Sequence, residues 1–228
     1  MNIAIAGLTA AGKTTHARIL AECLGYRYVS ATELILRITQ LKEDPRGVWF
    51  RNFEKLEALR AGDSLDDELE RRLLAIATAP DDRVVFDTWG LPWLYHGPLV
   101  RIWIESDAPS RLWKCYVSHL PDNPRSFTEC AEFIQKKDDS TRERFLRRHG
   151  FDIYTDHDRF DAILTNTHLI SGPTVEATLN GIAAFAPIVR ATAECFAFDN
   201  SEPIMRLQQN GSASQRKSIL QIRATRRS

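Results

Sequence analysis

The chain has 228 residues, of which 43% are hydrophobic and 26% are charged, and its 30 basic residues balance 30 acidic ones. This composition is sufficient for one hydrophobic core and excludes collagen-like, repetitive and highly charged disordered chains. No apolar run approaches the roughly 20 residues of a membrane-spanning helix, and a net charge of zero argues against broad nucleic-acid binding by the body of the protein.

The four cysteines (Cys23, Cys115, Cys130 and Cys195) are far apart and form no CxxC pair, so no zinc site is expected. Reduced thiols in the cytoplasm are the default for such a pattern. The first residues run directly from a strand pattern into a glycine-rich motif and do not resemble a signal peptide. We therefore expect a cytoplasmic protein without a membrane partner.

Residues 7–14 read Gly-Leu-Thr-Ala-Ala-Gly-Lys-Thr, which fits the phosphate-loop pattern. The apolar run 2–6 before it predicts a buried strand, and helical periodicity begins at Thr14. Glycines permit the tight turn, and successive backbone N–H groups form an anion nest at the helix N-terminus. Lys13 is expected to reach the β- and γ-phosphates of a nucleotide, and the Thr14 hydroxyl to bind Mg²⁺. The expected nucleotide-binding residues are Gly7, Ala10, Ala11, Gly12, Lys13, Thr14 and Thr15.

The first half of the chain continues with a helix that ends near Gly25 and a strand at 26–29. Ser30 and Glu33 have the spacing of a capping box at the start of the next helix. Two further helices are expected before the third strand, at 48–62 and from Leu65 onward. In the first of these, the apolar residues expected to face inward are Phe50, Phe53, Leu56 and Leu59.

In the second half, strands are expected at 84–86, 99–105 and 161–165, with Asp87 at the carboxyl end of the first. Helices are expected at 108–118 and, with a high charge content, from about Ser126 to His149. The last helix should begin at Pro173, a residue type favoured in the first turn. Its expected buried stripe consists of Val175, Leu179, Ile182 and Phe185.

Strands that alternate with helices predict an α/β protein: a three-layer α/β/α fold of the P-loop NTPase type, with a five-stranded parallel sheet and a helical lid. Ligands of such sheets bind at the carboxyl ends of the strands, where Gly7, Ser30 and Asp87 are expected. We assign one domain to residues 1–198.

Residues 199–228 lose the apolar periodicity, and from Ser201 onward they carry six Lys or Arg residues against one acid, Glu202. We therefore expect a disordered basic tail that adds little to the stability of the body. It is the one stretch whose charge suits nucleic acid.

Besides the phosphate loop, three segments occur in a characteristic order: 28–31, 66–72 and a stretch that comprises 137–145, 149–153 and 160–167. Together with the loop they resemble the nucleoside monophosphate kinases, most closely the short, archaeal-type cytidylate kinases. The resemblance covers about residues 1–185. It implies that the domain at 1–198 is a P-loop kinase domain, with acceptor-binding helices at about 31–80 and a lid at about 125–158. It implies ATP and Mg²⁺ as cofactors and a small nucleotide, CMP or dCMP first, as phosphoryl acceptor.

The resemblance also assigns roles to individual residues. Lys137 and Arg144 would close with the lid over the transferring phosphoryl, although the family has arginine at the position of Lys137. Two roles are open for Asp87, in the Mg²⁺ shell or as the base for the acceptor hydroxyl. Ser30 is expected at the start of the acceptor site. Trp89 is expected either to stack on a ring of the acceptor or to pack in the core.

The acceptor side departs from the family. The usual arginine after the third strand is replaced by Thr88, and the one in the helix after the second strand by Leu36, with Arg37 one position on. Arg37, or an arginine within 46–60, would have to bind an acceptor phosphate. A kinase of another acceptor (a nucleoside, a modified base in DNA or a small hydroxylated metabolite) therefore stays open. So does a nucleotide-binding regulatory protein with little catalysis.

Overall fold

The computed structural model describes residues 1–42, 48–80, 83–120 and 124–223. In this part of the chain, six strands form a single sheet in the order β2-β3-β1-β4-β5-β6. The first five are parallel, and β6 is antiparallel to β5. The strands are β1 (Asn2–Gly7), β2 (Arg27–Ser30), β3 (Val84–Asp87), β4 (Leu99–Glu105), β5 (Ala162–Thr165) and β6 (Ile219–Ile222).

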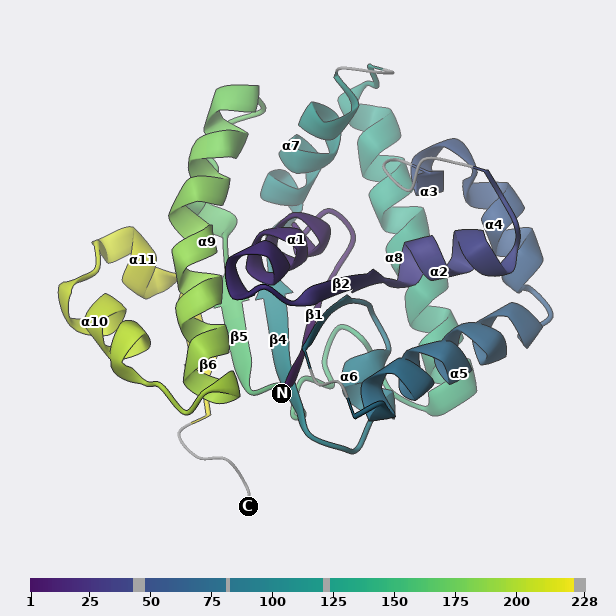
Figure 1. The fold of residues 1–228 in the computed structure, drawn as a ribbon. Helices are drawn as coiled ribbons and strands as arrows, with labels where there is room; N and C mark the ends of the chain where they lie inside the picture. The colour runs from purple at the N-terminus through teal and green to yellow at the C-terminus, as the bar shows by residue number, and fades with distance from the viewer. Residues whose placement is uncertain (43–47, 81–82, 121–123, 224–228) are drawn as a thin grey trace.

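Helices lie on both sides of the sheet (Figure 1). They are α1 (Lys13–Leu24), α2 (Ala31–Ile38), α3 (Val48–Arg51), α4 (Phe53–Arg60), α5 (Ser64–Thr78), α6 (Leu91–Leu94), α7 (Ala108–His119), α8 (Phe127–His149), the 3₁₀ turn Thr167–Leu169, α9 (Val175–Ala197), α10 (Glu202–Asn210) and α11 (Ala213–Lys217). None of the helices in the described ranges is long and apolar enough to cross a bilayer.

Strand β1 shows why the three-layer prediction is correct. Its residues are buried on both faces: Ile3 and Ile5 pack with α1 and α9, whereas Ala4 packs on the α2 and α5 side. A strand covered on both faces is characteristic of a parallel sheet between two helical layers. The α/β prediction is confirmed, except that the sheet has a sixth strand.

The register of the strands brings the site residues to one edge. Ile5 of β1 lies opposite Asp87 of β3, and Asp87 lies opposite Ser30 of β2. The phosphate loop leaves β1 at this edge and leads into α1. Gly7, Ser30 and Asp87 therefore lie at the carboxyl edge of the sheet, as predicted.

Helix α8 begins and ends where local chemistry dictates. The Ser126 hydroxyl accepts a hydrogen bond from the Glu129 backbone N–H, and the Glu129 carboxylate accepts one from the Ser126 backbone, which completes a capping box. At the other end, Gly150 adopts φ of 72°, a left-handed conformation that favours glycine. Both boundaries agree with the expected helix.

Two helix predictions are wrong in detail. The helix expected at 48–62 is two short helices separated at Asn52, and Leu59 is 44% exposed instead of inward. Helix α9 begins after Thr174, whose side chain caps it, so Pro173 lies before the helix. Val175 and Leu179 are exposed because the first turns of α9 reach beyond the strand ends, as Figure 1 shows.

The prediction of a disordered tail is wrong for residues 199–223. Helix α10 packs on α9 through Ile204, which is 4% exposed, and β6 pairs with β5 and covers that edge of the sheet (Figure 1). Few apolar residues are sufficient here because α9 and β5 already present surfaces that must be covered. Residues 224–228 of the predicted tail lie outside the described residues.

We therefore expect a chain truncated after Phe198 to melt about 5 °C or more below the full chain, because burying an Ile or Leu side chain contributes about 1.5–3 kcal/mol. The matched control is a chain that ends at Arg223, which keeps β6. Thermal unfolding followed by circular dichroism compares the two. Equal melting temperatures for both truncations would show that 199–223 adds no stability.

Candidate active site

The phosphate loop has the backbone that the motif requires. Gly12 adopts φ of 101° and Ala10 φ of 59°, both in the left-handed region. A Cβ on Gly7 would lie 2.5 Å from the carbonyl oxygen of Ile104 on β4, so only glycine fits between the loop and the strand. Gly12 directly precedes α1, so the loop amides lie at the N-terminal, positive end of the helix dipole.

Lys13 is the first residue of α1 and lies between the loop and the next pocket. Its Nζ donates a hydrogen bond of 2.9 Å to the carbonyl oxygen of Leu8 and lies 4.7 Å from the ring centroid of Trp89. Burial lowers the pKa of Lys13 to about 8, although the charge of Asp87 partly opposes this shift. A bound phosphate would therefore stabilise the charged form of this amine.

Asp87 connects the loop to the neighbouring strands. Its Oδ2 accepts hydrogen bonds from the Thr14 hydroxyl at 2.6 Å and from the Tyr28 hydroxyl at 3.0 Å. Burial, followed by the charge of Asp87, raises the pKa of Tyr28, so Tyr28 remains a donor. The Asp87 carboxylate is thus held beside Thr14 at the start of α1.

The pair formed by Thr14 and Asp87 fits a magnesium ion. Mg²⁺ prefers oxygen ligands and needs only one or two from the protein when phosphate oxygens and water supply the rest. Across the described ranges, no group of three or more His, Cys, Asp or Glu residues could hold a metal. Any Mg²⁺ here would be held jointly with nucleotide phosphates.

The lid helix contacts the phosphate loop through Asp138, which is 1% exposed. Its Oδ1 accepts a hydrogen bond of 2.9 Å from the Thr9 backbone N–H, and its Oδ2 pairs with Arg111. Arg111 also donates to the Thr9 carbonyl at 3.2 Å. A carboxylate thus occupies one amide of the loop, and the lid lies against the loop in this conformation.

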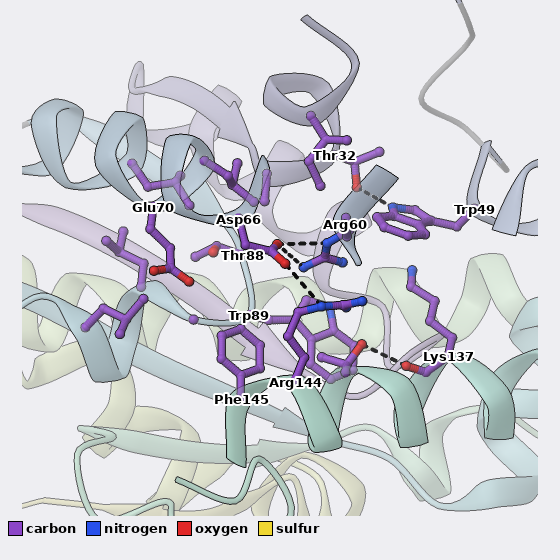
Figure 2. A pocket seen from close by; sticks show the side chains of 18 residues that line it. Thr32, Trp49, Arg60, Asp66, Glu70, Thr88, Trp89, Lys137, Arg144 and Phe145 are labelled. Atoms are coloured by element: carbon purple, nitrogen blue, oxygen red, sulfur yellow. Dashed lines mark hydrogen bonds and ion pairs between the residues drawn. The ribbon is translucent and has the colours of Figure 1, made fainter. Parts of the chain in front are cut away.

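A pocket adjoins the loop at Trp89 and lies between α2, α5 and α8 (Figure 2). One wall is apolar, with Ile35, Leu69 and Phe145. The polar groups that line it are Thr32, Arg60, Asp66, Glu70, Thr88, Lys137, Thr141 and Arg144. The cavity volume of the pocket is about 70 Å³, which accommodates a few water molecules but not a nucleotide.

Two buried arginines meet in this pocket. Arg60 donates to Asp66 Oδ1 from Nε at 2.8 Å and from Nη2 at 2.6 Å, and Arg144 Nε lies 3.1 Å from Asp66 Oδ2. Arg144 also donates to Glu57 at 2.6 Å. Burial alone would raise the pKa of Glu57, but hydrogen bonds from Arg144 and Ser140 outweigh it and lower the pKa. Figure 2 shows both guanidinium groups converging on Asp66.

Two polar groups in the pocket are not fully paired. Among the described residues, Arg144 Nη1 has no hydrogen-bond partner although it is buried. No carboxylate of the described residues pairs with Lys137, whose ammonium lies 4.6 Å from the ring centroid of Trp49. Burial, and then the charge of Lys13, lowers the pKa of Lys137 to about 7. The pocket therefore retains donors for an anion.

The lid is held over this pocket by a row of ion pairs from α8 to α4 and α5. Arg148 is 8% exposed on its side chain and meets Glu70 at 2.9 Å, and Arg144 is similarly buried, whereas exposed pairs such as Lys136–Glu54 contribute little singly. The row explains why the pocket is small, because it draws the walls together. Its members are Lys136–Glu54, Arg144–Glu57, Arg144–Asp66, Arg147–Asp63, Arg148–Asp63, Arg148–Asp67 and Arg148–Glu70. A ring nitrogen of His149 also lies within hydrogen-bond distance of Glu70, at 2.9 Å.

The comparisons with known proteins agree with this geometry. The model of the cytidylate kinase-like family matches residues 2–168. The chain belongs to the cytidylate kinase-like family. It is 31% identical over 171 residues to a cytidylate kinase of Desulfurococcus amylolyticus, covering 75% of this chain and 85% of the relative. It is 30% identical over 151 residues to a cytidylate kinase of Pyrococcus furiosus, covering 66% of this chain and 72% of the relative.

A solved structure supports the fold alone. An uncharacterized protein from Eubacterium ventriosum superposes with a TM-score of 0.52 at 13% identity, covering 72% of this chain and 88% of that one. Membership of the cytidylate kinase-like family makes the chain a phosphotransferase. The resemblance inferred from the sequence is therefore confirmed.

The structure brings most of the expected residues together in this cytidylate kinase-like protein. Trp89, Lys137 and Arg144 line the pocket, and Lys13 and Asp87 adjoin it. Gly7, Ala10, Ala11, Gly12 and Thr14 form the loop, and Thr15 is exposed in the first turn of α1.

Two expected acceptor residues lie elsewhere. The Ser30 hydroxyl caps α2 by accepting a hydrogen bond from the Glu33 N–H at 3.4 Å, and its neighbours Ala31 and Thr32 line the pocket instead. Arg37 is exposed on α2 and is not among the residues that line the pocket. The roles assigned to individual residues stay predictions.

Sequence reasoning did not single out Arg60, Tyr28, Asp138 or Asn166 as site residues. Arg60 falls within 46–60, where an arginine was expected, but nothing in the pattern distinguishes it from Arg46 or Arg51. Asn166 follows β5 at the carboxyl edge, so the argument that found Asp87 applies to it equally. The Tyr28 and Asp138 contacts span 59 and 129 residues and leave no local signal.

Proposed function

We propose that this protein transfers the γ-phosphoryl group of ATP to a nucleoside monophosphate, with CMP or dCMP as the first acceptors to test. One observation carries the proposal: a pocket lined by Arg60, Lys137 and Arg144 opens beside Trp89, against which Lys13 of the phosphate loop lies. Donor and acceptor sites are thus adjacent, as a direct transfer requires.

On the donor side, the loop amides and Lys13 would bind the ATP phosphates. Mg²⁺ held at Thr14 and Asp87 would neutralise charge on the β- and γ-phosphates. Asp138 must leave the Thr9 N–H before a phosphate oxygen can use it. Donor binding and movement of the lid are therefore coupled in this proposal.

On the acceptor side, Arg60 and Arg144 would take the place of the two arginines that the family has at the positions of Thr88 and Leu36. Both guanidinium groups are preorganised on Asp66, and Arg144 Nη1 remains available to an anion. A guanidinium binds phosphate oxygens in a bidentate manner, which a lysine does not do. The flat rings of Trp49 and Trp89 would accompany the base or the sugar.

The pocket must open for such an acceptor, because the ion pairs of α8 now draw its walls together. Closure of the lid would then exclude water before transfer, which prevents loss of the phosphoryl group to hydrolysis. In the closed state Lys137 and Arg144 would offset the charge that develops on the transferring group.

The deciding experiment measures ADP release from ATP and Mg²⁺ with a panel of acceptors: CMP, dCMP, UMP, AMP, cytidine and a simple sugar alcohol. We expect CMP or dCMP to give the highest kcat/KM. Turnover with only unphosphorylated acceptors would contradict a nucleotide acceptor. ADP release at one rate with and without every acceptor would contradict a kinase function.

One observation favours a second acceptor class. The charges of Arg60 and Arg144 are already balanced by Asp66 and Glu57, so the pocket could accept a neutral hydroxyl compound, with Asp87 as its base. The two acceptor classes predict different effects of replacing Arg60 on the KM of the acceptor, because only a phosphorylated acceptor needs the positive charge of Arg60.

Replacing Arg60 with glutamine is expected to raise the KM for CMP about tenfold or more and to leave the KM for ATP within twofold. Hydrogen bonds to a charged group contribute about 1.5–3 kcal/mol, and each 1.4 kcal/mol is a factor of ten. Steady-state kinetics measures both constants. Arg37→Gln, on the exposed face of α2, is the control and should change neither constant. Equal KM values for CMP in the two variants would show that Arg60 does not bind the acceptor phosphate.

Acceptor binding is also expected to take up a proton above pH 7. With a pKa of about 7, Lys137 is mostly neutral at pH 8, and a bound phosphate would raise its pKa and make it charged. Calorimetry of CMP binding at pH 8, in buffers of different ionisation enthalpy, should show uptake of a large fraction of one proton. In the Lys137→Arg variant the arginine is always charged, so proton uptake should be abolished. Undiminished uptake in this variant would show that another group takes up the proton.

A further inference from the structure

The carbonyl oxygen of Ala11, in the middle of the phosphate loop, is held by two side chains from distant parts of the chain. Asn166 Nδ2 donates to it at 2.8 Å and Lys114 Nζ at 3.1 Å. Lys114 comes from α7, and Asn166 follows β5. No other carbonyl of the loop has two side-chain donors among the described residues.

The two side chains also hold each other. Lys114 Nζ donates to Asn166 Oδ1 at 2.9 Å and to the Ser106 hydroxyl at 2.8 Å. An ammonium has three N–H donors and no acceptor, and the three acceptors around Lys114 match them in number. Asn166 and Ser106 are 3% and 4% exposed, so water competes little for these contacts. We call Lys114, Asn166 and Ser106 the loop clamp.

The stereochemistry of the peptide bond connects this clamp to phosphate binding. In a planar trans peptide the C=O and the following N–H point in opposite directions. Anchoring the Ala11 carbonyl on the protein side therefore directs the Gly12 N–H to the opposite side, into the anion nest. The anchor is needed because Gly12, at φ of 101°, permits the peptide to rotate at low cost.

We propose that Lys114 and Asn166 are positioning residues for the donor nucleotide: they hold the Ala11–Gly12 peptide so that the Gly12 N–H faces the phosphates. When it is protonated, Lys114 would also supply a positive charge on the side of the loop opposite a bound phosphate. Burial, and then the charge of Arg111, lowers the pKa of Lys114 to about 7, so a nearby phosphate would stabilise its charged form. This inference rests on the proposed use of a nucleotide as phosphoryl donor.

The test compares the binding of a nucleotide that carries phosphates, ADP, with the binding of its nucleoside, adenosine, which carries none. Calorimetry measures the Kd of ADP and of adenosine for the full chain, for Lys114→Met and for Asn166→Ala. We expect Lys114→Met to raise the Kd of ADP about tenfold or more and Asn166→Ala about threefold or more, with the Kd of adenosine within twofold. The double variant should lose less than the product of the two single losses, because both act on one carbonyl.

Several results would overturn the inference. A general structural role would weaken ADP and adenosine equally, and unchanged ADP binding in both folded variants would exclude any role of the clamp. If Lys114→Met does not fold, Asn166→Ala decides, because it removes a neutral contact and leaves the lysine paired with Ser106. Failure of the unmodified chain to bind ADP would overturn the donor site itself, whereas ADP binding without turnover on CMP would overturn only the proposed acceptor.

Discussion

Replacing Lys13 with alanine is expected to lower kcat about a thousandfold while the protein still folds. Lys13 would stabilise charge on the transferring group, and loss of such electrostatic stabilisation typically costs a factor of about 10²–10⁵. Stability should change little because Nζ bonds to the Leu8 carbonyl and not directly to a carboxylate, and Asp87 keeps its hydrogen bonds from Thr14 and Tyr28.

Turnover at saturating ATP and Mg²⁺, measured beside the melting temperature, tests this expectation. Lys55→Ala is the matched control, because Lys55 is exposed on α4 and does not line the pocket. It should leave both kcat and the melting temperature unchanged. Near-normal kcat in folded Lys13→Ala would contradict the phosphate-loop assignment.

Replacing Asp87 with asparagine is expected to lower kcat about a hundredfold or more. The change keeps the shape of the side chain and an acceptor for the Thr14 hydroxyl, but it removes the negative charge. If Asp87 belongs to the Mg²⁺ shell, the variant will also need a higher Mg²⁺ concentration for half-maximal stabilisation of its ADP complex against thermal unfolding. If Asp87 is the base, that Mg²⁺ dependence will be unchanged and only kcat will fall.

Tyr28→Phe is the matched control for Asp87. It removes one hydrogen bond to the same carboxylate oxygen and leaves the charge in place, so we expect kcat to fall less than tenfold. Equal losses in Tyr28→Phe and Asp87→Asn would show that the orientation of the carboxylate, and not its charge, limits the rate.

The sequence by itself determined the features that depend on local chemistry. Two glycines and a lysine at fixed spacing specify the phosphate loop, because backbone conformation and the N-terminus of α1 are properties of adjacent residues. The predicted bounds of the charged helix, from about Ser126 to His149, depend on local chemistry in the same way, because a serine cap and a left-handed glycine limit α8 at these positions. The carboxyl-edge position of Asp87 followed from the alternation of strands and helices.

Only the tertiary structure decided which distant groups meet. It placed Arg60 in the pocket beside the phosphate loop and Arg37 on the surface, since the packing of α4 against α5 orients Arg60 and no periodicity encodes that packing. It also brought Lys114 and Asn166, 52 residues apart, to one carbonyl of the loop. Strand β6 and helix α10 became ordered because β5 and α9 offer an open edge and an apolar face. Both segments are short and lie in a stretch without apolar periodicity, so the free energy that orders them comes from the surfaces they cover.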